Sequence, residues 1–185
     1  MKYFADETSI EWTKPHLQRF LATLAVVEGI CKIHVVAHSM GNRALTKILQ
    51  PSMLSHGLTA FNQIVLAAPD IDTAEFLQLA SQFNGSADRI TLYASSNDNA
   101  IKASKLLHSY PRAGESGDDI VITAGVDTVD ASTVDTSFMG HSYFADKRNV
   151  LSDLFYLIRE GKPPGDRFGL ESRANPRGGY WAFKP

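Results

Sequence analysis

The sequence predicts one α/β domain in which a mostly parallel sheet carries helices on both faces. Short segments rich in β-branched residues alternate with longer amphipathic segments along the 185-residue chain. Hydrophobic residues make up 44% of the chain, which is enough apolar material for one core. Strands that alternate with helices are joined by right-handed crossovers, so neighbouring strands are expected to run parallel.

The first predicted elements are a helix and a strand that together occupy residues 13–37. Thr13 can cap a helix whose first turn tolerates Pro15, and Gly29 ends the helical pattern. Apolar residues recur at helical spacing between these limits, namely Leu17, Phe20, Leu21, Leu24 and Ala25. The segment KIHVVA (32–37) is short and rich in β-branched residues, as expected for a strand buried on both faces.

The same alternation continues to residue 160. A helix over 43–50 ends where Pro51 removes a backbone donor. Further strands are predicted at 63–67, 89–94 and 119–123, because each is a short apolar run bounded by turn residues. The helices predicted between and after them lie at 72–83, 100–108 and 147–160.

Residues 161–185 differ in composition from the rest of the chain. They contain five Gly and four Pro, with Trp181 and Phe183 near the end. We expect a tail that lies over the surface and is held there by these aromatic side chains. The predicted organisation is a domain at 1–160 followed by a Gly/Pro-rich C-terminal tail at 161–185.

Charge and composition exclude several classes of protein. Lys plus Arg number 18 and Asp plus Glu number 20, so the net charge of −2 offers no general attraction for nucleic acid. No apolar stretch is long enough for a membrane span, and Asp6, Glu7 and Glu11 lie where the apolar part of a secretory signal would be. We therefore expect a cytoplasmic location for the chain as given, unless upstream sequence carries a signal.

Cysteine and motif content argue against metals and cofactors. Cys31 is the only cysteine, which excludes a disulfide within the chain and a multi-cysteine zinc site. The carboxylates after the strands have no His or Glu at ligand spacing, and neither a phosphate-binding loop nor a dinucleotide-binding glycine motif occurs. We expect no metal and no cofactor.

A serine motif follows the first predicted strand. Ala37-His38-Ser39-Met40-Gly41 is a variant of the G-x-S-x-G nucleophile elbow, with Ala in place of the first Gly. Such a turn between a strand and a helix exposes the serine hydroxyl above the sheet, where the Met40 N–H can donate to a developing oxyanion. The alternative is that Ser39 caps an ordinary helix.

Candidate partners for Ser39 follow later strands in the chain order that this motif requires. Asp98 follows the strand at 89–94, and His141 lies in a loop beyond the strand at 119–123. A histidine base and an orienting acid would complete a catalytic triad. Asp70, after the strand at 63–67, is the alternative acid, and His141 could instead be a surface loop histidine.

Four segments in combination are similar to a known family. IHVVAHSMGNRAL, VLAAPDID, LYASSNDNAI and GHSYF resemble an α/β-hydrolase family of mostly bacterial proteins with no settled function, over about Tyr3 to Gly161. The resemblance implies Ser39 as nucleophile, Asp98 as acid and His141 as base. It also implies strands before the elbow strand and a loop that supplies a second oxyanion donor. Because only about 30 residues of helical character precede Lys32, the chain resembles the later part of the fold, N-terminally truncated and without its opening strands.

Two functions are compatible with these observations. The first is a serine hydrolase that cleaves a carboxylic ester, or a related small-molecule acyl substrate, through the Ser-His-Asp triad. The second is a catalytically silent module of the same fold that binds a ligand or partner, favoured by the missing oxyanion loop. A sheet that begins at residues 32–37 would also leave one edge unpaired, so we expect self-association through that edge.

Overall fold

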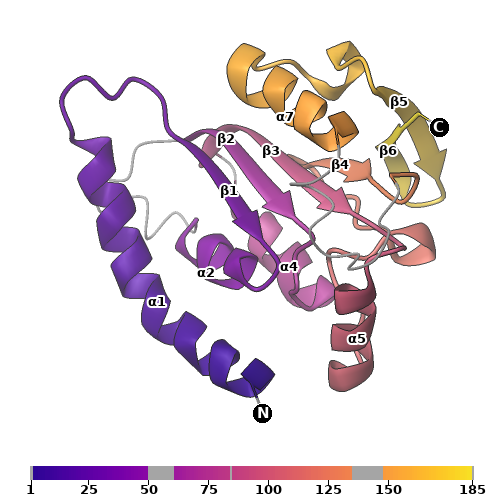
Figure 1. Ribbon diagram of the computed structural model, residues 1–185, viewed down its shortest axis with the longest axis horizontal. Coiled ribbons are helices and arrows are strands. Elements are labelled where there is room, and N and C mark those ends of the chain that lie inside the picture. Colours follow the sequence, from indigo (N-terminus) through magenta and orange to yellow (C-terminus); the bar gives the residue numbers. More distant parts are fainter. Residues whose placement is uncertain (1, 50–60, 84, 135–147, 185) are drawn as a thin grey trace.

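The computed structural model describes residues 2–49, 61–83, 85–134 and 148–184 (Figure 1). Its centre is one six-stranded sheet in the order β1-β2-β3-β4-β6-β5. The strands are β1 (His34–His38), β2 (Phe61–Ala67), β3 (Ala87–Ala94), β4 (Asp127–Asp130), β5 (Leu170–Asn175) and β6 (Gly178–Phe183). All neighbouring pairs are parallel except β5 and β6, which form an antiparallel hairpin. The predicted fold class is confirmed.

In the described part of the chain, five α-helices connect or flank these strands. They are α1 (Lys2–Ala25), α2 (Gly41–Ile48), α4 (Thr73–Ala80), α5 (Asn99–His108) and α7 (Arg148–Glu160). Helix α1 begins well before the predicted cap at Thr13 and continues through Pro15, which lies inside it rather than in its first turn. Short 3₁₀ turns occur at Gly117–Asp119 and Pro164–Asp166.

Each face of the sheet has its own hydrophobic core. On one face, α1, α2 and α4 cover β1 to β3 through Leu21, Leu45, Ile48 and Phe76. On the other, α7 covers β3 and β4, so that it lies on the opposite side of the sheet from α2 and α4 in Figure 1. The later halves of the inner strands β2 and β3, residues 64–67 and 90–94, are buried on both faces, which explains why these stretches are almost entirely apolar.

The predicted strand at 119–123 is wrong. Gly117–Asp119 forms a 3₁₀ turn, and the fourth parallel strand is β4, eight residues later. Ile120 and Val121 are nevertheless buried, and the Thr128 hydroxyl donates to the Val121 carbonyl at 2.7 Å. The apolar pattern therefore predicted correctly that these residues are buried. They do not form a strand of the sheet.

The C-terminal segment also differs from the expected surface tail. Strand β6 pairs in parallel with β4, with Val129 opposite Trp181, and β5 closes that side of the sheet. Phe183 is almost fully buried and stacks near Tyr93 of β3, with ring centroids 6.4 Å apart. Glycine and proline content pointed to irregular structure, whereas these residues occupy the hairpin turn and the approach to it.

A buried ionic cluster fastens this segment to the body of the domain. The Arg167 Nη1 atom lies 3.0 Å from Asp153 Oδ2 on α7, and both side chains are essentially inaccessible to solvent. The Tyr93 hydroxyl also donates to Asp153. Burial raises the pKa of the Asp153 carboxyl and of the Tyr93 phenol, because water no longer stabilises their charged forms.

Strand β1 forms the free edge of the sheet on the side opposite the hairpin. Within the described part of the chain it pairs only with β2, and Val36 at its centre is 44% exposed. A short uncharged edge strand with an exposed valine is a template for pairing with another chain.

We therefore predict that the protein self-associates through β1. Val36→Lys places a charge at the centre of this edge and should shift the sedimentation profile towards monomer. Leu106→Lys is the matched control, because Leu106 on α5 is also exposed but lies outside the sheet. A monodisperse monomer before substitution would contradict the prediction.

Candidate active site

Ser39 occupies a strained turn between β1 and α2. Its φ angle is +52°, in the left-handed region that residues other than glycine rarely adopt. The Ser39 N–H donates to the Ala67 carbonyl at the end of β2, at 3.0 Å. Such a conformation costs about 1–3 kcal/mol and persists only where surrounding contacts impose it. A left-handed serine between a strand and a helix matches the geometry expected of a nucleophile elbow.

The side chain of Asn42 holds this turn in place. Asn42 is fully buried, and its Nδ2 atom donates to the carbonyls of Ser39 at 3.0 Å and of Ala67 at 3.1 Å. The Ser39 carbonyl also accepts from the backbone N–H groups of Asn42, at 3.2 Å, and Asp70, at 3.3 Å. The carbonyl of the peptide that follows Ser39 is thus held by donors from α2 and from the loop after β2, while Asn42 also contacts the end of β2.

Met40 and Gly41 begin helix α2 directly after the serine. No group in the described residues accepts a hydrogen bond from the Met40 N–H, which lies at the positive end of the α2 dipole. The elbow motif has a small residue two positions after the serine, where the sharp turn is expected to bring neighbouring backbone close, but Gly41 does not have this role. A Cβ atom there would meet nothing within 4 Å among the described residues, so the turn does not demand a glycine at this position.

A small apolar cavity opens beside Ser39. Its volume is about 340 Å³, at the lower end of the range for small-molecule sites. The cavity is lined by two residues of the turn after β1, by one aspartate and by one side of α5. These residues are Ser39, Met40, Asp70, Ala100, Ile101, Ala103, Ser104 and Leu107. Its shape suits a small hydrocarbon group placed next to a serine hydroxyl.

Asp70 lies at one wall of this cavity within a buried cluster. Its Oδ1 atom accepts from the Ser104 hydroxyl at 2.6 Å, and it lies 3.5 Å from Arg112 Nε and 3.9 Å from Arg43 Nη2. The Arg43 Nε also donates to the Asp70 carbonyl at 2.6 Å. One carboxylate thus faces two guanidinium groups, which offset its negative charge.

Asp98 follows β3 and is completely buried. Its Oδ1 atom accepts from the N–H groups of Ala100 and Ile101, both at 3.0 Å, so Asp98 is the N-cap of α5. Because β1, β2 and β3 are neighbours in a parallel sheet, Ser39, Asp70 and Asp98 lie along the same edge. Strands β1 and β3, which precede Ser39 and Asp98, are two strand spacings apart, or about 10 Å.

A crossing segment ties the loops after β2 and β3 together. The Gly114 N–H donates to the Pro69 carbonyl at 2.9 Å, and the Gly114 carbonyl accepts from Ser95 at 3.0 Å. A Cβ atom at Gly114 would lie 2.7 Å from the backbone carbon of Ala68, so a side chain cannot be accommodated here without moving backbone. The loop after β3 also contacts the segment after β4, because the Ser132 hydroxyl accepts a hydrogen bond from the Ser96 N–H at 2.8 Å.

The predicted base, His141, lies outside the described residues, so its position relative to Ser39 and Asp98 stays a prediction. Among the described residues no cluster of three His, Cys, Asp or Glu side chains could hold a metal ion. In the same part of the chain, no helix combines the length and hydropathy needed to cross a bilayer.

Sequence reasoning did not identify Asn42, Ser104 and Arg112 as parts of this region. Asn42 lies one helical turn after the serine, and only its position three residues beyond Ser39 hints at contact. Ser104 and Arg112 come from α5 and the following loop, and nothing in their sequence context distinguishes them from surface polar residues.

The parallel sheet, the strained serine turn at its edge and the acidic residues after the next two strands define the α/β-hydrolase class. The family model for alpha/beta hydrolases of unknown function (DUF900) matches residues 1–160, and the chain belongs to this family. This confirms the family resemblance. No curated protein and no solved structure matched the chain.

The role of Asn42 can be measured directly. Asn42→Ala removes the donor to two buried carbonyls, so we expect a loss of about 1–3 kcal/mol in the free energy of unfolding. We also expect about tenfold slower labelling of Ser39 by a fluorophosphonate, because the strained turn is no longer held. Asn62→Ala is the matched control at the opposite end of the sheet. Equal labelling rates for Asn42→Ala and the unsubstituted chain would show that Asn42 does not position the elbow.

Proposed function

We propose that this protein is a serine hydrolase that cleaves a carboxylic ester or a related small acyl substrate. The carrying observation is the left-handed backbone of Ser39 at the β1–α2 turn, with its side chain on a small cavity. A strained serine at the carboxyl edge of a parallel sheet is the arrangement used for nucleophilic attack. Membership of a hydrolase family supports the same function.

In the proposed reaction the Ser39 oxygen attacks the carbonyl carbon while its proton passes to His141. Asp98 orients the imidazole and stabilises its positive charge. The Met40 N–H donates to the oxyanion of the tetrahedral intermediate. His141 then returns the proton to the leaving alcohol, which departs as the acyl-enzyme forms. Water activated by His141 hydrolyses this ester, releasing the acid and restoring Ser39, so no cofactor or metal takes part.

The cavity supports an apolar acyl or alcohol group of limited size. Apart from Ser39, Asp70 and Ser104, its walls are alanine, isoleucine, leucine and methionine side chains. Burial of hydrocarbon against these walls would contribute about 25 cal/mol for each Å² removed from water. Esters with short aliphatic or small aromatic groups are accordingly the substrates to test first.

The nucleophile assignment predicts covalent labelling at one residue. A fluorophosphonate probe should label the folded protein, and mass spectrometry should place the adduct on Ser39. Ser39→Ala should abolish both labelling and hydrolysis of p-nitrophenyl butyrate, whereas Ser95→Ala, at the end of β3, is the control and should retain both. Absence of labelling in folded protein would favour the catalytically silent module instead.

The choice between the two candidate acids predicts an order of effects. Asp98→Asn should slow hydrolysis more than Asp70→Asn at equal folded fraction, and His141→Ala should abolish it. The reason is that two arginines already offset the charge of Asp70, which leaves less of it to stabilise an imidazolium. Both rates need comparison at matched folded fraction, because either aspartate supports local structure. A larger loss in Asp70→Asn would transfer the acid role to Asp70.

A further inference from the structure

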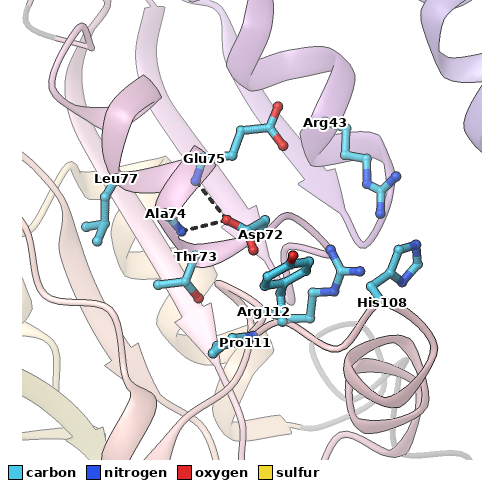
Figure 2. Close-up of a pocket in the computed structure, with 10 residues that line it drawn as sticks. Arg43, Asp72, Thr73, Ala74, Glu75, Leu77, His108, Pro111 and Arg112 are labelled. Carbon is cyan, nitrogen blue, oxygen red and sulfur yellow. Dashed lines mark hydrogen bonds between the residues drawn. The ribbon is translucent and has the colours of Figure 1, made fainter.

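A second and larger cavity lies one turn along α2 from the serine. Its volume is about 730 Å³, and it is bounded by α2, the first turns of α4, the end of α5 and the loop after α5. Figure 2 shows the side chains of Arg43, Arg112 and His108 converging at one side of it, while Leu77, Thr73 and Pro111 lie at the other. The cavity therefore has a polar end and a more apolar end.

Arg112 is the most informative residue at the polar end. It is only 3% exposed, yet its Nε and Nη2 atoms have no hydrogen-bond partner among the described residues. Its ion pair with Asp70, 3.5 Å from Nε, is too long for a good hydrogen bond. Buried guanidinium N–H groups normally find acceptors, so this side chain is under-satisfied and faces a cavity large enough for a ligand.

The charges around this end favour an anion. The guanidinium groups of Arg43 and Arg112 lie 3.9 and 3.5 Å from the same carboxylate oxygen of Asp70, so two cationic side chains meet at this end of the cavity. Two further carboxylates line the cavity but are engaged elsewhere. Asp72 Oδ1 caps α4 by accepting from Ala74 and Glu75, and the Glu75 carboxylate lies 3.3 Å from Lys47. In Figure 2, Glu75 points away from Arg112 and His108.

The other end of the cavity is mainly hydrocarbon. Leu77, Ala74 and Pro111 contribute apolar surface, and the ring of Tyr110 is also part of the lining. Leu77 and Tyr110 are 39% and 63% exposed, so their apolar surface is accessible to a ligand in the cavity. We propose that this cavity binds a carboxylate carried on an apolar body, with the carboxylate against Arg43 and Arg112 and the body against Leu77 and Pro111. Planar carboxylates match the forked donors of arginine.

Three ligands with the same hydrocarbon body test this proposal on the unsubstituted chain. Octanoate, 1-octanol and octylammonium should be titrated by calorimetry at fixed ionic strength. Octanoate should bind about tenfold more tightly than either of the others, because only its head group pairs with guanidinium. Equal affinity for octanoate and octanol, or no binding of octanoate, would overturn the proposal. The result does not depend on whether Ser39 is catalytic.

Substitutions then locate the site. Arg43→Gln should remove most of the preference for octanoate over octanol, whereas Arg159→Gln, the same change on the exposed surface of α7, should leave it intact. Leu77→Ala should weaken octanoate and octanol alike. Ala103→Phe fills the smaller cavity beside Ser39 and should not change octanoate binding. Loss of binding in Ala103→Phe with retention in Arg43→Gln would place the ligand beside Ser39 and overturn the assignment.

Discussion

The geometry of the site depends on a single peptide, the one that joins Ser39 to Met40. Its carbonyl accepts from the backbone of Asn42, the side chain of Asn42 and the backbone of Asp70. These donors come from α2 and from the loop after β2, so the strained serine links the first strand to its neighbour. The cost of the left-handed conformation is offset because the same contacts bury Asn42 and close the end of the sheet.

Asp70 lies between the cavity beside Ser39 and the larger cavity lined by Arg43 and Arg112. On one side it forms part of the wall beside Ser39, and on the other it balances Arg43 and Arg112. A buried carboxylate between two guanidinium groups is strongly held, since its charge stays compensated as long as one of the two arginines remains. A ligand that draws Arg43 or Arg112 towards itself would therefore change the electrostatic environment of the serine. The two cavities therefore share this carboxylate as a neighbour, although different residues of α5 line each of them.

Sequence patterns predicted those elements whose hydrophobic pattern and turn residues agree with their position in the sheet. The elbow was visible because small residues flank Ser39 between a β-branched strand and a helix, and Asp98 was visible because it follows a continuous apolar strand. Strand β4 was not, because its sequence DTVD has little apolar character, while the nearby DIVIT segment packs against the core outside the ladder. The hairpin β5–β6 was missed because β6 joins the sheet by pairing with β4, which is distant in sequence. Local composition does not indicate such long-range pairing.

Asn42, Ser104 and Arg112 could not be predicted for a related reason. Each acts through a buried contact made across the fold, and a polar residue at an isolated position carries no periodic signal. The position of Asp70 was predicted, but its two arginine partners were not, since Arg43 and Arg112 come from different elements. What the sequence lacked was the set of tertiary contacts that decide which polar residues are structural and which line a cavity.

The ionic cluster between α7 and the C-terminal segment bears on where this domain can be divided. The family match ends at residue 160, yet Arg167, which compensates the buried Asp153, lies beyond it. Cutting the chain at that boundary would leave a carboxylate in the core without its cation and would turn β4 into an unpaired edge. Fusion partners or affinity tags intended for the family region alone therefore belong after residue 183, where the last strand has already closed the sheet.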